Sequence, residues 1–179
     1  MLWTLDYLFG INIGERLNFN HYFDNMIRNI NYKGYVSQDD LVKFEFNKAK
    51  PPYQLSIPVD NVGKILLFPS GKCRLMGLKK PYSEKMHLPI KIYDIEIQSI
   101  TVTFNVGHRI NLLKVASQLG RRDRIYEPEL FPALRLTKFN PICVNVFSTG
   151  RVVILGLKSL SYQNILKIIE RDLWVYKYE

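Results

Sequence analysis

Residues 147–158 read FSTGRVVILGLK, and residues 68–79 read FPSGKCRLMGLK. The two segments stand at a numbering offset of 79 (147 − 68) and share the aromatic start, both glycines and the closing lysine. In the later segment, Thr149-Gly150 is a turn dipeptide followed by a β-branched run, which is typical of a hairpin. The pattern therefore predicts a β-hairpin that the chain uses twice.

A second pair of matching segments extends this repeat. Residues 12–18, NIGERLN, are similar to residues 105–111, NVGHRIN, at a numbering offset of 93 (105 − 12). Both pairs occur in the same order, which predicts a tandem duplication with a first repeat at 1–90 and a second at 91–179. The offsets differ by 14 (93 − 79), so we expect the first repeat to carry an insertion of that length between its motifs.

Hydrophobic periodicity assigns the elements of the second repeat most clearly. Alternating β-branched residues predict strands, and apolar residues three and four apart predict helices. Gly120 ends the first helix and Ser161 begins the second. The expected elements are a strand at Ile92–Val106, a helix at Arg109–Leu119, strands at Leu134–Phe139, Ile142–Phe147 and Arg151–Leu157, and a helix from Ser161.

The first repeat follows the same plan with a weaker pattern. Its expected elements are a strand at Leu2–Ile13, a helix at Phe19–Ile30, and strands at Leu41–Phe46, Tyr53–Val59, Lys64–Phe68 and Lys72–Leu78. A second helix would have to fit within Lys80–Lys91, where Pro89 limits it to about two turns. We therefore expect a partner, or a rearranged segment around Tyr35–Pro52, to cover this half of the sheet.

The composition is that of a globular protein with a basic surface. The 179 residues carry 25 Lys and Arg against 16 Asp and Glu, a net charge of +9. This excess favours a polyanionic partner, while a solvated basic surface has the same composition. No run approaches the roughly 18 apolar residues of a membrane helix. Two cysteines and three dispersed histidines predict no metal site, and we expect no cofactor and no small-molecule substrate.

The segment between the first helix and the hairpin of the second repeat is the most specific motif. Residues 126–132 read YEPELFP. This segment resembles, residue for residue, the stirrup of the TATA-box-binding protein family, and residues 147–158 resemble the family's hairpin. Residues 97–100, IQSI, are similar to the family's first strand, which reads Ile-Gln-Asn before an apolar residue. The resemblance spans nearly the whole chain and is strongest in the second half.

The resemblance implies an α+β fold: a saddle of two pseudo-symmetric antiparallel β-sheet repeats, with helices on the convex face and DNA on the concave face. Such proteins insert apolar side chains into the minor groove and kink the duplex. Phe131 and Phe147 match the intercalating pair of the second repeat, and Phe68 matches one member of the first. The other falls at residues 51–53, where either Tyr53 or one of the two prolines can serve as the wedge. On composition alone, Phe147 would be a core residue.

The last strand of each hairpin departs from the family. The family presents a valine and a threonine, two residues apart, to the DNA. Val153 and Leu155 stand at these positions in the second repeat, and Arg74 and Met76 in the first. Both threonines are thus replaced by apolar residues, and Arg74 is a candidate for insertion into a narrow groove.

The first-strand asparagines, which contact the central base pairs in the family, are also altered. Ser99 takes this position in the second repeat, and a residue near Asp6 takes it in the first. Together with the hairpin changes, this predicts recognition of A·T-rich DNA by shape and deformability rather than sequence-specific readout.

Basic residues at matching positions are expected to contact phosphates. Lys72 and Arg151 match the family's hairpin lysine, and Arg135 or Lys138 lies near its backbone-contacting arginine. Such contacts add affinity without reading sequence. The alternative for each is an ordinary surface charge.

The stirrup carries an acidic pair in a basic chain. In the family, the positions of Glu127, Glu129 and Leu130 are gripped by a transcription factor IIB-like partner, through which RNA polymerase is recruited. Charge complementarity favours such an interface. The alternative is that Pro128 and Pro132 shape a loop with no partner.

Three functional hypotheses follow. The first is a divergent transcription initiation factor that binds and bends A·T-rich promoter DNA. The second is a scaffold of the same fold that has lost autonomous DNA binding. The third, an enzyme, lacks a catalytic constellation in the sequence, so we expect no enzyme activity. We expect a viral or parasite source, no membrane partner, and a location in the nucleus, or in the host cytoplasm for a virus that replicates there.

Overall fold

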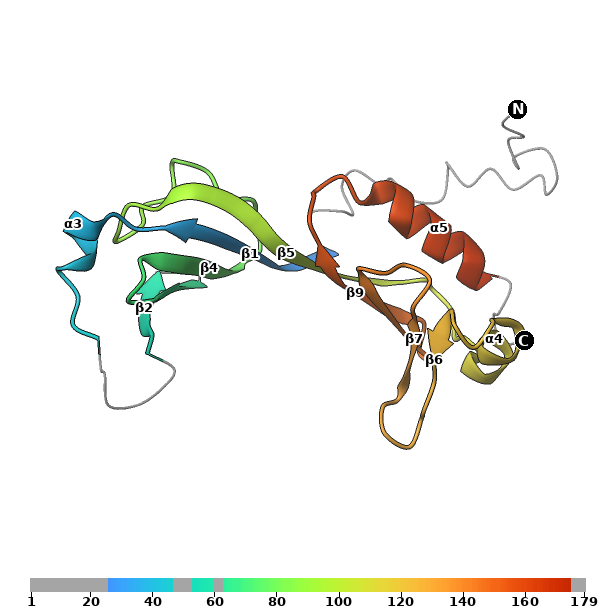
Figure 1. The fold of residues 1–179 in the computed structure, drawn as a ribbon. Helices are drawn as coiled ribbons and strands as arrows, with labels where there is room; N and C mark the ends of the chain where they lie inside the picture. The colour runs from blue at the N-terminus through green and yellow to red at the C-terminus, as the bar shows by residue number, and fades with distance from the viewer. Residues whose placement is uncertain (1–25, 47–52, 60–62, 175–179) are drawn as a thin grey trace, which may run out of the picture.

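The computed structural model describes residues 26–46, 53–59 and 63–174, which form an antiparallel sheet of nine strands (Figure 1). The strands lie in the order β2-β3-β4-β1-β5-β9-β8-β7-β6. Their bounds are β1 Ile27–Tyr35, β2 Leu55–Val59, β3 Gly63–Leu67, β4 Lys72–Leu78, β5 Tyr93–Asn105, β6 Arg124–Ile125, β7 Ala133–Leu136, β8 Cys143–Phe147 and β9 Arg151–Leu157. The helices described are α3 Gln38–Leu41, α4 Leu112–Gln118 and α5 Gln163–Trp174.

Two similar halves of the sheet meet at β1 and β5. In the first half Ile30 of β1 is opposite Leu78 of β4, and in the second half Ile100 of β5 is opposite Leu157 of β9. The numbering offset between β1 and β5 is therefore 70 (100 − 30), and that between β4 and β9 is 79 (157 − 78). The second value equals the hairpin offset read from the sequence, and it also relates β2 and β3 to β7 and β8. The repeat boundary at residue 90 stays a prediction.

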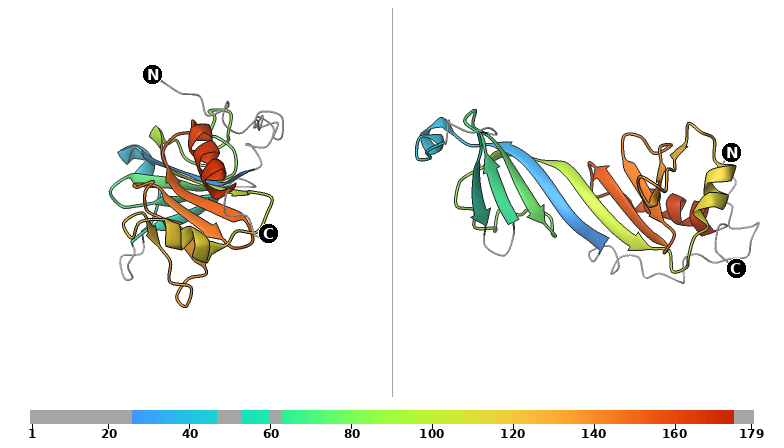
Figure 2. Two further views of the ribbon diagram at one scale, coloured as in Figure 1. Left: turned by 90° about the vertical axis from the view of Figure 1, so that its right-hand side faces the viewer. Right: turned by 90° about the horizontal axis from the view of Figure 1, so that it is seen from below.

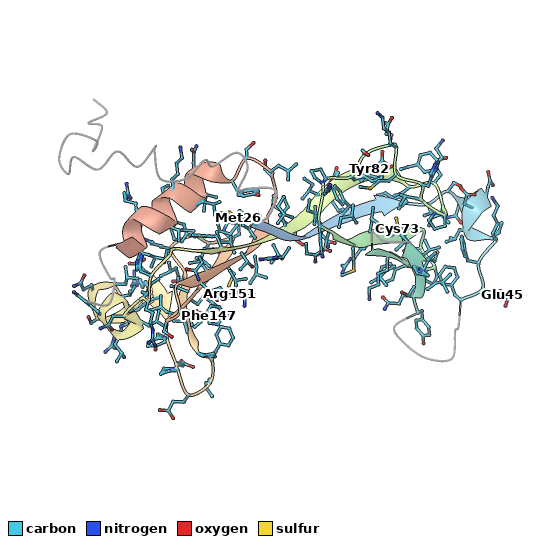
Figure 3. The ribbon with its side chains drawn as sticks, turned by 180° about the vertical axis from the view of Figure 1, so that it is seen from behind. Met26, Glu45, Cys73, Tyr82, Phe147 and Arg151 are labelled. Atoms are coloured by element: carbon cyan, nitrogen blue, oxygen red, sulfur yellow. The ribbon has the colours of Figure 1, made fainter. Side chains whose placement is uncertain are left out.

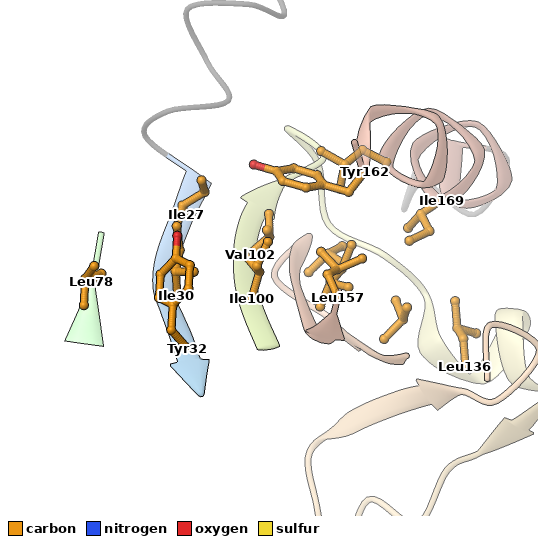
Figure 4. Close-up of a cluster of buried hydrophobic side chains, with 14 of the residues drawn as sticks. Ile27, Ile30, Tyr32, Leu78, Ile100, Val102, Leu136, Leu157, Tyr162 and Ile169 are labelled. Carbon is orange, nitrogen blue, oxygen red and sulfur yellow. The ribbon is translucent and has the colours of Figure 1, made fainter. Parts of the chain in front are cut away.

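Helix α5 covers one face of the second half, while α4 lies at its outer end (Figures 1 and 2). Leu166, Ile169 and Leu173 are spaced three and four residues apart, and all three are buried. Figure 4 shows Ile169 of α5 and Tyr162, which precedes the helix, in the same buried cluster as Leu157 of β9. Burial of each aliphatic side chain contributes about 1.5–3 kcal/mol. No described helix is long and apolar enough to cross a membrane.

The first half has an extended cover in place of a second helix. Residues 80–91 contain no helix, where the sequence allowed one of at most about two turns. The backbone amide of Tyr82 donates to the hydroxyl of Tyr32 at 2.8 Å, and the two rings meet edge to face. Ile90 is buried in the core. The segment after β4 and residues 36–46 both contribute to the cover, and Val36 and Leu41 of the latter are part of the core.

The predictions for the second half are confirmed, with small shifts. The strands at 151–157 and 92–106 are β9 and β5, and the remaining two are β7 and β8. Helix α4 begins later than expected, because the side chain of Asn111 accepts a hydrogen bond from the amide of Lys114 and caps the helix at that point.

Three predictions for the first half are wrong. Residues 27–30 belong to β1 and not to a helix at 19–30. The apolar positions Ile27 and Ile30 are three residues apart, as on a helix, because the register of β1 against β5 shifts between Ile27 and Asn29, a β-bulge that adds a residue to the strand period. Residues 41–46 end α3 and form a turn instead of a strand. The strand expected at residues 2–13 lies outside the described residues.

The insertion expected in the first repeat is the third error. Tyr35 is opposite Lys72, a separation of 37 (72 − 35), whereas its counterpart Asn105 is opposite Arg151, a separation of 46 (151 − 105). The first half is therefore shorter between these strands, by nine (46 − 37). The sequence match between residues 12–18 and 105–111 does not reflect the repeat, because the counterpart of Asn105 is Tyr35.

Candidate nucleic-acid interface

The face of the sheet opposite α5 carries no helix in the described residues, and both ends of the sheet bend away from α5, so that the sheet curves concavely on this side (Figure 1). We call it the concave face. Its residues alternate along each strand with the buried core residues. From the four central strands it includes Asn29, Asn31, Lys33 and Tyr35 of β1, Ser99, Thr101, Thr103 and Asn105 of β5, Lys72, Arg74 and Met76 of β4, and Arg151, Val153 and Leu155 of β9.

The centre of the concave face is polar. The side-chain amide of Asn31 donates to the hydroxyl of Ser99 at 3.2 Å, across the junction of the two halves. Asn29 is the counterpart of Ser99 by the offset between β1 and β5, and its Oδ1 accepts a hydrogen bond from the amide of Gly77 at 3.0 Å. The first half thus keeps an asparagine at this position. The expectation of a residue near Asp6 is wrong, because it rested on the misplaced first strand.

Two phenylalanines form an exposed aromatic pair at the outer end of the second half. The rings of Phe131 and Phe147 meet edge to face, with centroids 6.1 Å apart and planes at 69°. The amides of Leu130 and Phe131 both donate to the carbonyl of Glu127, which folds the stirrup into a tight turn beneath β7. Phe131 is 42% exposed, and Phe147 is half-buried. The pair is therefore accessible to a ligand, and Figure 3 shows Phe147 on the side of the sheet away from α5.

The first half repeats only part of this arrangement. The amide of Gly71 donates to the carbonyl of Phe68, as that of Gly150 does to Phe147. Phe68 is half-buried at the same hairpin position. The counterpart of Phe131 by the hairpin offset is Pro52, which lies outside the described residues. Tyr53 is 48% exposed but corresponds to Pro132, so its role as a wedge stays a prediction.

The altered hairpin residues lie where the sequence places them. Arg74 is opposite Lys33, and its counterpart Val153 is opposite Thr103. Leu155 is exposed and Met76 is half-buried. The first half of the concave face is therefore more basic, and the second half more apolar.

The candidate phosphate contacts separate into two groups. Lys72 and Arg151 are exposed at counterpart positions, and Arg135 is exposed in β7 in the same row as Val153. Lys138 instead forms a 2.7 Å salt bridge with Asp172 of α5. This ties Lys138 to the helix-covered side and argues against a phosphate contact.

One cation of the concave face was missed by sequence reasoning. Lys33 forms a 2.8 Å salt bridge with Glu96 of β5, and both side chains are exposed. The hydrogen bond and the charge of Lys33 hold the pKa of the Glu96 carboxyl below its ordinary value. The carboxylate on this face is therefore offset by a neighbouring cation. Correct placement of β1 was the only signal that could have revealed the pair.

The tip of the stirrup projects polar and apolar groups into solvent. Glu127 and Glu129 are exposed, and Leu130 is 81% exposed. A leucine so exposed directly after two acidic residues has the composition of a small protein-binding patch. No group of three or more potential metal ligands occurs within residues 26–46, 53–59 and 63–174.

Comparisons with known proteins agree with this geometry. The family described as "Transcription factor TFIID (or TATA-binding protein, TBP)" matches residues 94–171. TATA-box-binding protein 2 of Haloferax volcanii is 31% identical over 134 residues, which cover 67% of this chain and 72% of the relative. The TATA-box-binding protein of Methanothermobacter thermautotrophicus is 31% identical over 136 residues, with coverages of 66% and 72%.

A solved structure matches the fold. The chain aligns with the Methanococcus jannaschii TBP at a TM-score of 0.64 and 24% identity, covering 83% of this chain and 97% of that one. Sheet order, pseudo-symmetry and stirrup are thus accompanied by similarity along most of the chain. The protein belongs to the TATA-binding protein family, of which it is a divergent member.

Proposed function

We propose that this protein is a transcription initiation factor that binds A·T-rich promoter DNA in the minor groove through its concave face, and bends it. The observation that carries the proposal is the pair of Phe131 and Phe147 at one end of the concave face, on which the described residues place no helix. The names of the relatives above describe binding to the TATA box, which supports the same assignment for this chain.

The aromatic pair suits the insertion step. A minor-groove binder wedges apolar side chains between base pairs, and the unstacking it causes is compensated by contacts with the bent duplex. A phenylalanine ring loses little conformational freedom when it is fixed and can stack on the opened step. The edge-to-face contact of Phe131 with Phe147 holds both rings in place before DNA arrives.

The rest of the concave face favours recognition by shape. Val153, Leu155 and Met76 offer no hydrogen bonds to base edges, and the minor groove displays only a degenerate pattern. A·T-rich DNA has a narrow minor groove and contains easily deformed base steps. It is therefore selected by the low cost of bending it rather than by direct contacts with its bases. Lys72, Arg74 and other exposed cations add affinity that depends on salt.

The stirrup is proposed to bind a transcription factor IIB-like protein that recruits RNA polymerase. Glu127 and Glu129 supply negative charge, and the exposed Leu130 beside them supplies an apolar contact. A complementary basic partner would gain both specificity and association rate from this charge. The proposed place of action is the nucleus, or the host cytoplasm if the source is a virus that replicates there.

A second candidate function is a scaffold that acts only through protein partners. It is favoured by the apolar residues Met76 and Leu155 on the concave face. In that case a IIB-like protein binds the free chain, and the double variant Glu127→Ala, Glu129→Ala abolishes this binding while no duplex is bound. Binding of the IIB-like protein only in the presence of promoter DNA contradicts the scaffold hypothesis.

The distinguishing experiment is binding to fluorescent duplexes, one A·T-rich and one G·C-rich, across a range of salt concentrations. We expect tighter binding to the A·T-rich duplex. Lys72→Ala and Arg151→Ala should each reduce the slope of log affinity against log salt by about 0.9, the effect of one phosphate contact. Lys138→Ala is the matched control and should leave the slope unchanged. Equal, weak binding to both duplexes that vanishes with salt would contradict the proposal.

A further inference from the structure

A row of aromatic and basic side chains crosses the concave face of the first half. Tyr93 of β5 is directly opposite Tyr35 of β1, and Tyr35 is directly opposite Lys72 of β4. The amide of Phe68 donates to the carbonyl of Lys72 at 3.0 Å, which continues the row to the predicted wedge residue. Directly opposed residues of a sheet project to the same face. The four side chains therefore share the concave face.

Both tyrosines are accessible to a ligand. Tyr35 is 49% exposed and Tyr93 is 42% exposed. The ammonium of Lys91 lies 4.9 Å from the ring centroid of Tyr93, a cation–π contact that places a second positive charge beside the row. Rings that remain half exposed between two lysines match a ligand with both apolar surface and negative charge.

The backbone around the pair is closely packed. A Cβ atom on Gly34 would lie 2.6 Å from the Cγ2 atom of Ile92 and 2.8 Å from the carbonyl oxygen of Tyr93. Only glycine allows β1 and the start of β5 to approach this closely. Tyr93 is therefore fixed beside Tyr35 rather than carried on an independent loop.

The two halves differ at this row. The counterpart of Tyr35 in the second half is Asn105, whose Oδ1 accepts a hydrogen bond from the amide of Gly107 at 2.8 Å. The side chain of Asn105 thus stabilises the turn that follows β5. Conversely, the second half has Phe131 where the first half has Pro52. The first half thus has a proline at the counterpart of Phe131 and carries two tyrosines elsewhere on the same face.

We propose that Tyr35, Tyr93 and Lys72 form an additional DNA-binding site that holds the sugar–phosphate backbone of the duplex beside the step contacted by Phe68. The inference rests on the proposed DNA-binding function and deepens it. The tyrosine rings pack on deoxyribose, their hydroxyls donate to phosphate oxygens, and the ammonium of Lys72 supplies the charge. The site adds affinity in the first half without reading sequence.

The test uses the full chain and duplexes with an A·T-rich centre flanked by short or long G·C arms. For the wild type, we expect long arms to increase affinity. The double variant Tyr35→Ala, Tyr93→Ala should bind the long duplex about tenfold more weakly, comparable to the loss of one base or sugar stacking contact. It should lose most of the dependence on arm length. Because neither tyrosine carries charge, the salt slope should stay unchanged, whereas Lys72→Ala should lower it.

Two controls separate binding from folding. Tyr35→Phe keeps the ring and should retain most of the affinity, so that a structural loss is distinguished from a lost contact. Ile168→Ala removes an exposed apolar side chain of α5, on the opposite side of the sheet, and should have no effect. Thermal unfolding followed by circular dichroism should give the same midpoint for the tyrosine variants and the wild type.

The outcomes distinguish the two proposals. If the wild type binds A·T-rich duplex and the double variant binds equally well, the tyrosine site is wrong and the proposed function stands. If the wild type binds no duplex, the proposed function fails and the site fails with it. A hydroxyl-radical footprint of the wild-type complex needs no variant: protection that continues beyond the step at Phe68 supports the site, and protection that stops there overturns it.

Discussion

The side-chain amide of Asn31 donates a hydrogen bond to the hydroxyl of Ser99, 3.2 Å away, across the junction between β1 and β5. These residues come from different halves and lie opposite one another in the sheet. The Oδ1 atom of Asn31 is buried and has no hydrogen-bond partner among the described atoms. At the centre of the concave face, the amide nitrogen of Asn31 thus has a hydrogen-bond partner and its amide oxygen has none among the described atoms.

This arrangement predicts an asymmetry between two substitutions. Ser99→Ala removes the acceptor and leaves the Asn31 amide with two unsatisfied groups, which should lower the free energy of unfolding by about 1–2 kcal/mol. Asn31→Val removes the bond together with the buried unsatisfied oxygen, so its cost should be under about 1 kcal/mol. Urea unfolding measures both. A larger loss for Asn31→Val would show that the amide has a partner after all.

Substitution of the hairpin glycine Gly150 by alanine should lower the free energy of unfolding far more than the same substitution at Gly107. Both have left-handed φ angles, +85° and +83°, but a Cβ on Gly150 would lie 2.0 Å from the carbonyl oxygen of His108, whereas Gly107 has nothing within 4 Å. Gly107→Ala should therefore cost only the backbone strain, about 1–2 kcal/mol. Gly150→Ala should cost at least twice as much, because the hairpin must also move. If urea unfolding gives equal losses in the free energy of unfolding, the hairpin backbone shifts at no cost, which contradicts this prediction.

Helix α5 should be attached to the sheet in a pH-dependent manner by Lys138 and Asp172. Burial raises the pKa of the Asp172 carboxyl, but hydrogen bonds from Lys138 and Arg171 outweigh this effect and hold the pKa below its ordinary value. A carboxyl whose pKa is lower in the folded state contributes stability above the unfolded pKa, near 4, and loses it as the pH falls through the folded value.

Lys138→Ala should accordingly lower the free energy of unfolding by about 0.5–1 kcal/mol at neutral pH, the range for a partly exposed ion pair. The difference from wild type should shrink as the pH falls below about 4, where the carboxyl of the unfolded chain is protonated first, and vanish once Asp172 of the folded protein is protonated as well. Lys85→Ala, an exposed cation in the segment after β4, is the charge control and should show neither effect. A difference that persists unchanged at acid pH would assign the loss to packing against Phe139 instead.

The two cysteines should report on occupancy of the concave face. Cys143 is half-buried on that face, opposite Leu155, and its thiol donates to Asn145 at 3.6 Å. Cys73 is 2% exposed in the core, and burial raises the pKa of its thiol to about 11. Iodoacetamide should therefore modify Cys143 first. A·T-rich duplex should slow this reaction, and a mass-spectrometric time course in which DNA leaves Cys143 unprotected would place the duplex elsewhere.

The second half of the fold was predictable from sequence because its strands keep a regular period and its turns carry diagnostic residues. Thr149-Gly150 marks the hairpin, and β9 has the predicted bounds. The aromatic pair of Phe131 and Phe147 follows from the stirrup motif and the register of β7 and β8.

The first half was less predictable because a β-bulge hides its first strand. The shift of register between Ile27 and Asn29 gives this part of β1 the spacing of a helix, and the positions assigned to the first strand were displaced as a result. Asn29 was consequently missed, as was the pairing of Tyr35 with Tyr93, which depends on contacts distant in sequence. The pairing of Lys138 with α5 was equally invisible, because it needs the packed helix.

The most direct test of the central claim is the bend itself. A duplex with an A·T-rich centre and a fluorescent donor and acceptor at its two ends is saturated with protein, and energy transfer reports the end-to-end distance. We predict that the wild type shortens this distance, and that Phe131→Ala at saturation leaves the duplex nearly straight while the protein remains folded. Saturated binding by the wild type with no change in energy transfer would contradict a wedge-inserting, DNA-bending concave face.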